Sequence, residues 1–248
     1  MSNNIKTANR EICRLQNWYM SLSNYTLPVN FVKLRVNEIA LLSGDESVAD
    51  DVETINKAVI SRLELAMKQY SGNCFVTTDY YAPTDTERFE NKRGAVYSAA
   101  SAWKYLCASE KIRHAAQSGE VNYLCVKPFR SFNQTREFRL FISEGRLRAM
   151  SQYNLVRHFR RLEGFKEKYY ETAKNFVDEI SWLLPAKNIV VDIYITSQNK
   201  VLIMDLNEWR GTTNPLLLHS WDQDWDVDLG ILLMRPPMKI KGDVNVSF

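Results

Sequence analysis

The chain has 248 residues, of which 45% are hydrophobic and 25% are charged, and its formal net charge is +3. This length and composition are typical of a globular protein with one large domain or two small ones, and the small charge excess does not indicate a nucleic-acid-binding protein. The sequence begins with polar residues and has no apolar run of about 18 residues, so we expect neither a secretory signal nor a membrane span. The four cysteines form no Cys-x-x-Cys pair, which argues against a zinc site and a disulfide framework. We therefore expect a cytoplasmic protein with reduced thiols.

The first half of the chain predicts a helix, a strand, a second helix and a second strand. Apolar residues at the three-four spacing of a helix run from Val52 to Tyr70, which predicts an amphipathic helix over residues 50–70. The stretch "CFVTTDYY" then predicts a strand leading into a polar loop around Pro83. A helix is predicted over residues 95–107, and "YLCVKPF" predicts a strand in which Pro128 must lie at an edge or an end.

The second half predicts two hairpins separated by one long helix. The stretch "REFRLFISEGRLRAMSQY" predicts a hairpin with its turn near Glu144-Gly145. An amphipathic helix is predicted after Gly164 and ending before Pro185, followed by strands over residues 188–195 and 200–206 and a mostly irregular tail. Adjacent strands joined by short turns favour an α+β fold with antiparallel-rich sheets and packed helices over a doubly wound parallel sheet.

The last hairpin carries two carboxylates on the same predicted face. If Gln198-Asn199 form a two-residue turn, Asp192 lies opposite Asp205, and Asn207 shares their face. Two unit charges roughly 5 Å apart repel by about 3 kcal/mol at an effective dielectric constant of about 20, so a positive charge is expected between them.

Mg²⁺ suits these three side chains, because it takes carboxylate and carboxamide oxygens and is normally completed by substrate phosphates. For either aspartate alone, a solvated or turn-capping role is the simpler interpretation. The pair together with Asn207 favours a metal site.

At the same residues the chain resembles a known family. Asp192, Asp205 and Asn207 are spaced like the metal-binding signature of ATP-grasp proteins. Within that superfamily, the stretches "REFRLFISEGRLRAMSQY", "VVDIYI", "VLIMDLNEW" and "PLLLHSW" are similar to motifs of the cell division cycle protein 123 family. The resemblance runs over about residues 121–225, and upstream it rests on Phe75, Ala82, Pro83 and Asp85.

The resemblance implies an ATP-grasp-like fold that binds ATP with Mg²⁺. We expect a mainly helical N-terminal segment (residues 1–70), a smaller lobe (71–130) and a larger lobe with the metal residues (131–248). Eukaryotic family members are assembly chaperones that bind the gamma subunit of translation initiation factor two. A protein-assembly chaperone is therefore the function that the resemblance implies, with a protein partner.

Five further residues are candidate nucleotide ligands. Lys127 offers a point charge and Arg139 a planar fork for phosphate oxygens, and Glu137 accompanies Arg139 in the motif. Tyr123 and Cys125 flank a strand backbone that could read the edge of adenine. The alternative for Lys127 and Arg139 is an ordinary ion pair with a nearby acid.

Three departures from the family pattern leave other functions open. Thr77 stands where the family has a nucleotide-contacting lysine, and Thr84 replaces a basic residue. Val190 stands where ligases of the wider superfamily often have an arginine that stabilises a charged intermediate. The alternatives are an ATP-dependent ligase or phosphoryl- or nucleotidyl-transferring enzyme acting on a protein, a small molecule or an RNA end, and a fold that binds no nucleotide.

Two charged stretches complete the sequence. The basic run "RHFRRLEGFKEK" over residues 157–168 could meet RNA or an acidic protein tail, although a solvated face is the simpler interpretation. The stretch "WDQDWDVD" over 221–228 lacks the glycine and distal glutamate of a calcium loop, so we expect an acidic surface loop in which Trp221 and Trp225 are packing anchors.

Overall fold

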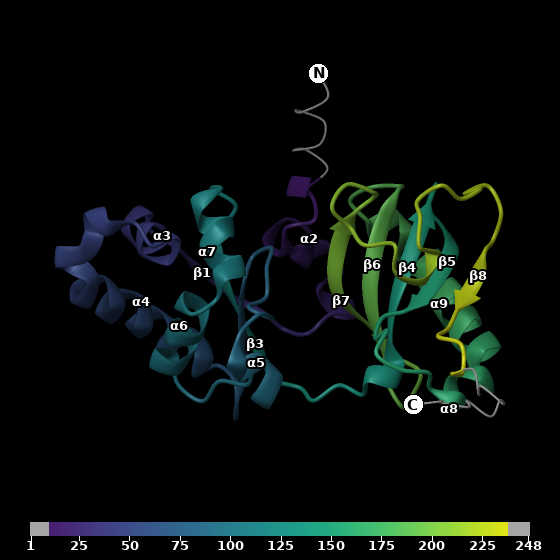
Figure 1. Ribbon diagram of the computed structural model, residues 1–248, viewed down its shortest axis with the longest axis horizontal. Helices are drawn as coiled ribbons and strands as arrows, with labels where there is room; N and C mark the ends of the chain where they lie inside the picture. The colour runs from purple at the N-terminus through teal and green to yellow at the C-terminus, as the bar shows by residue number, and fades with distance from the viewer. Residues whose placement is uncertain (1–9, 238–248) are drawn as a thin grey trace, which may run out of the picture. The chain divides into compact units, whose positions relative to one another are not determined.

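The computed structural model describes residues 10–237 (Figure 1). Its helices (α), 3-10 turns (η) and strands (β) follow one another along the chain as α2 Leu15–Leu22, η1 Ser23–Tyr25, β1 Asn30–Lys33, α3 Val36–Ser43, η2 Glu46–Asp51, α4 Val52–Met67, β2 Cys74–Thr78, α5 Glu87–Lys92, α6 Ala99–Cys107, α7 Glu110–Gln117, β3 Tyr123–Pro128, η3 Gln134–Arg136, β4 Glu137–Ser143, β5 Arg146–Gln152, α8 Arg160–Glu163, α9 Lys166–Ile180, η4 Ser181–Leu183, β6 Ile189–Ile195, β7 Val201–Glu208, η5 Leu216–Leu218 and β8 Gly230–Leu232.

The chain forms two compact units. Unit 1 comprises the chain up to Phe132 together with Leu183–Pro185 and Leu202–Leu206. Unit 2 comprises Asn133–Trp182, Ala186–Val201 and the chain from Asn207 onward.

Unit 1 is built on a three-stranded antiparallel sheet in the order β1-β3-β2. Leu124 and Val126 of the central strand β3 are fully buried in a core that also contains Val59 and Leu63 of α4 and Trp103 and Leu106 of α6. Residues alternate between the two faces of a strand, so Tyr123, Cys125 and Lys127 belong to the other face of β3. On that face Phe31 of β1 makes an edge contact with Tyr19 of α2, with the ring centres 5.4 Å apart.

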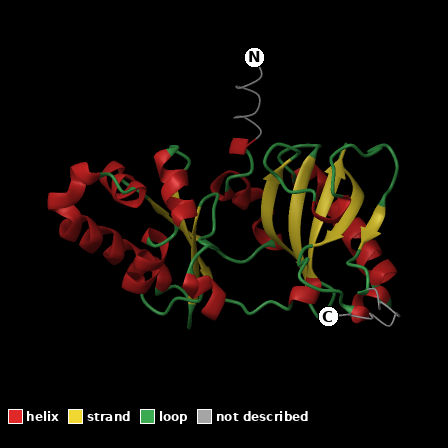
Figure 2. Ribbon diagram, viewed as in Figure 1, coloured by secondary structure: helices red, strands yellow, loops and turns green. Residues whose placement is uncertain are grey.

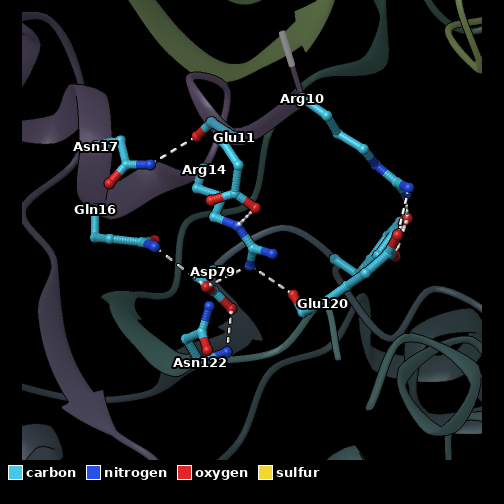
Figure 3. Close-up of polar contacts among 9 residues, drawn as sticks. Arg10, Glu11, Arg14, Gln16, Asn17, Asp79, Glu120 and Asn122 are labelled. Carbon is cyan, nitrogen blue, oxygen red and sulfur yellow. Dashed lines mark hydrogen bonds and ion pairs between the residues drawn. The ribbon is translucent and has the colours of Figure 1, made fainter. Parts of the chain in front are cut away.

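A buried polar cluster ties the start of unit 1 to its sheet (Figure 3). The Arg14 guanidinium donates to Asp79 Oδ2 at 2.9 Å and to the Glu120 carbonyl at 2.6 Å. Asp79 also accepts the Asn122 backbone N–H, and its side chain is 0% exposed. Next to this pair, Arg10 contacts the Glu120 carboxylate. Because these partners are far apart in sequence, the cluster closes the N-terminal segment onto the loops that flank β2 and β3.

Unit 2 contains a five-stranded sheet in the order β7-β6-β4-β5-β8, drawn as yellow arrows in Figure 2. The pairs β4–β5 and β4–β6 are antiparallel, and β5–β8 is parallel. Helix α9 lies against β5 and β8, and its Tyr169 contacts Phe138 of β4. Phe138 pairs with Ile193, so the side chain of Ile193 belongs to the face of β6 on the α9 side.

The opposite face of the unit 2 sheet is covered by the C-terminal segment. Phe141 and Val190 are cross-strand partners and are fully buried beneath Trp209, Trp221 and Trp225. The ring centre of Phe141 lies 5.6 Å from that of Trp221 and 5.9 Å from that of Trp225. The expectation that Trp221 and Trp225 are packing anchors is confirmed, and the aspartates between them are exposed.

The α+β fold class is confirmed, and most predicted elements are present. The helix expected over residues 95–107 begins only at Ala99, because Ser98 caps it by accepting the Ser101 backbone N–H. The sequence interpretation missed β1, α7 and β8, and α5 lies in the expected polar loop. Strand β8 has only three residues and was expected to be irregular, and it is held by pairing with β5 rather than by its own apolar pattern.

The predicted two-residue turn at Gln198-Asn199 is wrong. The Thr196 backbone N–H donates to the Lys200 carbonyl at 2.8 Å, which leaves three residues in the loop, and Asn199 takes a left-handed φ of 60°. The alternation of buried residues in β7 then shifts by one position at Met204–Asp205, as in a β-bulge. The extra loop residue and the shift offset each other, so Asn207 still reaches the face of Asp192.

In the part of the chain that the structure describes, no helix is long and apolar enough to cross a membrane.

Replacing Arg14 by alanine should destabilise unit 1 strongly. The change leaves the Asp79 carboxylate buried without its ion-pair partner, which typically costs about 3–5 kcal/mol. We expect a loss of this size in urea unfolding followed by circular dichroism. Arg113→Ala is the matched control, because Arg113 pairs with Glu110 at the surface and its loss should cost at most about 1 kcal/mol. Equal effects of the two variants would contradict a stabilising role for the buried cluster.

Asp85 should contribute pH-dependent stability as a cap of α7. It accepts the Ser109 hydroxyl at 2.6 Å and the Lys111 backbone N–H at 3.0 Å. Burial acts to raise the pKa of Asp85, but these hydrogen bonds and the Lys111 charge outweigh it and lower the pKa below its usual value. A lowered folded-state pKa gives stability that is present above the unfolded pKa of about 3.9 and is lost as the pH falls through the folded pKa.

Asp85→Asn should therefore cost about 1 kcal/mol at pH 7 and less as the pH approaches about 3, in urea unfolding at a series of pH values. Asp178→Asn, at an exposed position of α9, is the control and should stay within about 0.5 kcal/mol of the parent protein. A difference between Asp85→Asn and the parent that does not change with pH would sink the assignment.

Candidate functional site

Arg139 and Asp192 form an ion pair on the face of the unit 2 sheet opposite α9. They are direct cross-strand partners on β4 and β6. Arg139 Nε donates to Asp192 Oδ1 at 2.7 Å and Nη2 donates to Oδ2 at 2.8 Å. Both residues are only 7% exposed. This two-pronged geometry is the strongest arrangement of an arginine with a carboxylate, and burial increases its strength.

Two asparagines extend this pair into a network. Asn207 Nδ2 donates to Asp192 Oδ2 at 3.0 Å, and Arg139 Nη1 donates to the Asn214 carbonyl at 2.8 Å. The structure thus brings together three of the predicted site residues, namely Arg139, Asp192 and Asn207. The predicted nucleotide ligand Arg139 directly contacts a predicted metal ligand, which is the ion pair that the sequence left open as the alternative for Arg139.

This network bears on how a magnesium ion could bind. Asp192 Oδ1 accepts one hydrogen bond and Oδ2 accepts two, so Oδ1 keeps one lone pair free of these contacts. The carboxamide oxygen of Asn207 is the second oxygen in this network, after Asp192 Oδ1, that could coordinate a metal ion. These donors fit Mg²⁺, but the Arg139 guanidinium already neutralises Asp192. The donor chemistry therefore suits an ion that arrives with anionic phosphates better than an ion that arrives alone.

Tyr153 lies beside the network at the end of β5. The Arg139 guanidinium carbon is 5.4 Å from the centre of the Tyr153 ring, within the range of a cation–π contact. The Tyr153 backbone N–H donates to the Glu137 carbonyl at 3.1 Å. Glu137 is half-buried and pairs with Tyr194 on β6, so it lies two residues from Arg139 on the same side of β4.

The loop that supplies the Asn214 carbonyl is held by Glu208 at the end of β7. The Glu208 carboxylate accepts the backbone N–H and the hydroxyl of Thr212 at 3.0 and 3.1 Å. Gly211 has a φ of +59°, and a Cβ there would lie 2.4 Å from the Glu208 carboxylate. A side chain at residue 211 would displace the Glu208 carboxylate and strain the backbone, so Gly211 lets Glu208 hold the loop that carries Asn214.

The remaining nucleotide candidates lie in unit 1, on the face of β3 away from the helical core. Tyr123 and Lys127 are half-buried, and Cys125 is fully buried opposite Thr77 of β2. Burial raises the pKa of the Cys125 thiol, and the charges of Asp79 and Asp205 add to this effect while Lys127 opposes it. Cys125 is therefore a neutral thiol, and its part in a site would be contact rather than charge.

Asp205 is the third predicted metal ligand. It is half-buried, and its Oδ1 accepts the backbone N–H of Leu206 at 3.0 Å. The direct opposition of Asp205 to Asp192 rested on the two-residue turn and stays a prediction.

In residues 10–237 no three His, Cys, Asp or Glu side chains come together as a metal site of their own. This finding does not count carboxamides, so it does not test a site made from two aspartates and Asn207.

Tyr153, Glu208 and Asn214 were missed by the sequence interpretation. Asn214 precedes a proline, a pair that signals a turn, and Gly211 marks a position that tolerates positive φ. These signals could have located the turn. The contact of Asn214 with Arg139 could not have been found, because it depends on where the loop folds back over the sheet.

Comparison with known proteins identifies a family and several relatives that this chain is similar to. The family model D123 matches residues 42–226, which is most of the chain. A translation initiation factor eIF2 assembly protein of Vanderwaltozyma polyspora is 32% identical over 116 residues, covering 46% of this chain and 31% of that protein. Cell division cycle protein 123 of Candida glabrata is 25% identical over 227 residues, covering 82% of this chain and 62% of that protein. The matches thus span between about a third and three fifths of these relatives.

The fold is also that of a solved structure. C-terminally truncated Cdc123 from Schizosaccharomyces pombe superimposes with a TM-score of 0.79 at 18% identity, covering 93% of this chain and 98% of that one. The resemblance to the cell division cycle protein 123 family is therefore confirmed by both sequence and fold. With its model matched over residues 42–226, the chain belongs to the D123 family.

Proposed function

We propose that this protein binds ATP with Mg²⁺ and acts as an ATP-dependent protein-assembly chaperone of the translation initiation factor type, working in the cytoplasm. The observation that carries the proposal is the buried network of Arg139, Asp192 and Asn207, which stands at the residues that match the ATP-grasp metal signature. The protein partner is suggested by relatives whose name is translation initiation factor eIF2 assembly protein.

The network contains one carboxylate and one guanidinium, which suit a ligand that brings both a cation and phosphates. Asp192 and Asn207 are oriented by hydrogen bonds rather than left to turn freely, which keeps the entropic cost of coordination low. In the proposal, Asp192, Asp205 and Asn207 hold Mg²⁺, while Arg139 and Lys127 contact phosphate oxygens and Glu137, Tyr123 and Cys125 contact the nucleotide. A bound Mg²⁺ would neutralise phosphate charge, and Arg139 would then share its guanidinium between Asp192 and a phosphate.

Binding is favoured over ligase chemistry by the surroundings of Asp192. Val190, at the position where ligases often have an arginine, is fully buried among Phe141 and the tryptophans and leaves no room for a cation. Thr77, in place of the family lysine, is only 6% exposed and offers no charge. With these groups absent, nothing at either position would stabilise a charged intermediate. Nucleotide is thus proposed as a ligand that orders the protein.

ATP should bind only together with Mg²⁺, and Mg²⁺ alone should not bind measurably, because Arg139 already compensates Asp192. We expect isothermal titration calorimetry to show binding of Mg²⁺-ATP by the parent protein and a loss of about tenfold or more in affinity for Asp205→Ala. The absence of heat with the parent protein at millimolar Mg²⁺-ATP would refute nucleotide binding.

Arg139 needs a control that separates binding from folding, because Arg139→Ala leaves Asp192 buried without a partner. Arg139→Lys keeps the charge but lacks the planar fork, and it should weaken ATP binding while the protein stays folded by circular dichroism. Arg146→Ala, at an exposed residue of β5, is the matched control and should bind ATP like the parent. ATP binding by Arg139→Lys equal to that of the parent would remove Arg139 from the site.

The assembly role should appear as nucleotide-dependent binding to a protein partner. We expect the gamma subunit of translation initiation factor two to bind this protein more tightly with Mg²⁺-ATP than without nucleotide, measured by biolayer interferometry. Asp205→Ala should remove the difference between the two conditions. If the gamma subunit binds in neither condition, it is not the partner of this protein, even if the protein is found to bind ATP.

A further inference from the structure

The segment that follows β5 exposes apolar and basic side chains together. We refer to this patch as the arginine surface, and it consists of Leu155, Val156, Arg157, Arg160, Arg161 and Phe165. Val156 is 87% exposed, Phe165 41% and Leu155 38%, and all three arginines are exposed. Single apolar residues at a surface need no explanation, but three beside three arginines within one short segment form a combined patch.

The backbone under this surface is held in place. The buried Gln152 side chain donates from Nε2 to the carbonyls of Asn154 and Arg157, and it accepts the Met234 backbone N–H. Phe159 and Leu162 are buried and anchor the segment from below. Val156 is therefore presented on an ordered loop. A partner binding there would lose little free energy to ordering that loop.

The three arginines keep their hydrogen-bonding edges open. In the described part of the chain none of them forms an ion pair with a carboxylate, whereas the neighbouring Glu163 is taken by His158 at 2.9 Å. Arg157 lies 5.1 Å from the ring centre of Phe159, and Arg161 lies 5.6 Å from that of Phe165. Stacking uses the face of a guanidinium and leaves its in-plane N–H donors free, so these forks are oriented to take carboxylates or phosphates.

A protein ligand fits these features better than a nucleic acid. Single-stranded nucleic acid is held largely by stacking of bases on open aromatic faces. Here Phe159 is buried and Phe165 has a guanidinium next to it, while the most exposed apolar group is the aliphatic Val156. Aliphatic side chains offer bases no stacking face, but they pack well against the apolar residues of a peptide.

We propose that the arginine surface docks an acidic protein segment in which carboxylates alternate with large aliphatic residues. The carboxylates pair with Arg157, Arg160 and Arg161, and the aliphatic residues cover Leu155 and Val156. The inference extends the proposed function by giving the chemistry of a protein partner. It uses none of the candidate ATP ligands, so it stands or falls separately from nucleotide binding.

The test is fluorescence anisotropy without nucleotide, using a fluorescein-labelled 16-residue peptide in which Glu or Asp alternates with Leu. We expect the parent protein to bind this peptide, and the triple variant Arg157→Glu, Arg160→Glu, Arg161→Glu to bind it about tenfold or more weakly. The double variant Leu155→Ser, Val156→Ser keeps every charge and should weaken binding several-fold. Both variants change exposed residues and should retain the circular dichroism spectrum of the parent.

The matched control reverses three exposed lysines of unit 1, with Lys57→Glu, Lys68→Glu and Lys104→Glu, for the same change in net charge. It should bind the peptide nearly as the parent does. An equal loss in the control would mean that only net charge matters and would overturn the proposal. So would equal binding of a peptide with Gln and Asn in place of its acids, no binding by the parent, or preference for a 16-nucleotide oligouridylate, which would indicate an RNA surface.

Discussion

The buried pair of Arg139 and Asp192 is the contact on which the candidate site depends. The pair joins β4 to β6. Asp192 Oδ2 also accepts a hydrogen bond from Asn207, and Arg139 donates to the Asn214 carbonyl in the loop after β7. Removing either charge would leave the other buried, which is costly, so the pair constrains any chemistry at this place. A ligand that takes Asp192 must offer Arg139 a new anion. ATP with Mg²⁺ meets that condition, because it brings a cation for the carboxylate and phosphates for the guanidinium.

Both units use buried ions in the same way. In unit 1 Arg14 and Asp79 fasten the N-terminal segment to the sheet, and their further partners are backbone groups and the side chains of Glu11 and Gln16. In unit 2 the ions are joined by the Asn207 carboxamide, the Asn214 backbone carbonyl and the Tyr153 ring, and Asp192 Oδ1 keeps one lone pair free of these contacts. Burial of charge is thus not by itself a sign of function in this protein.

The candidate ligand Arg139 contacts the residue that begins the segment bearing the arginine surface. Tyr153 stacks on Arg139 at one end of the segment, and Val156 is exposed three residues later. Arg139, which is proposed to contact phosphate, is thus linked through the Tyr153 ring to the segment that bears the arginine surface.

The sequence by itself determined the α+β class, the long helices, the hairpin at Glu144-Gly145 and the family, because apolar periodicity, turn glycines and motif spacing are local properties. It also placed Asn207 on the face of Asp192, although by a turn that proved one residue too short and was offset by the irregularity at Met204–Asp205. Only the tertiary structure decided that Arg139 neutralises Asp192, that Asn214 and Tyr153 join them, and that three residues near the end of the chain form β8. Each of these depends on which distant segments meet across a sheet, and no local pattern of residues encodes such a meeting.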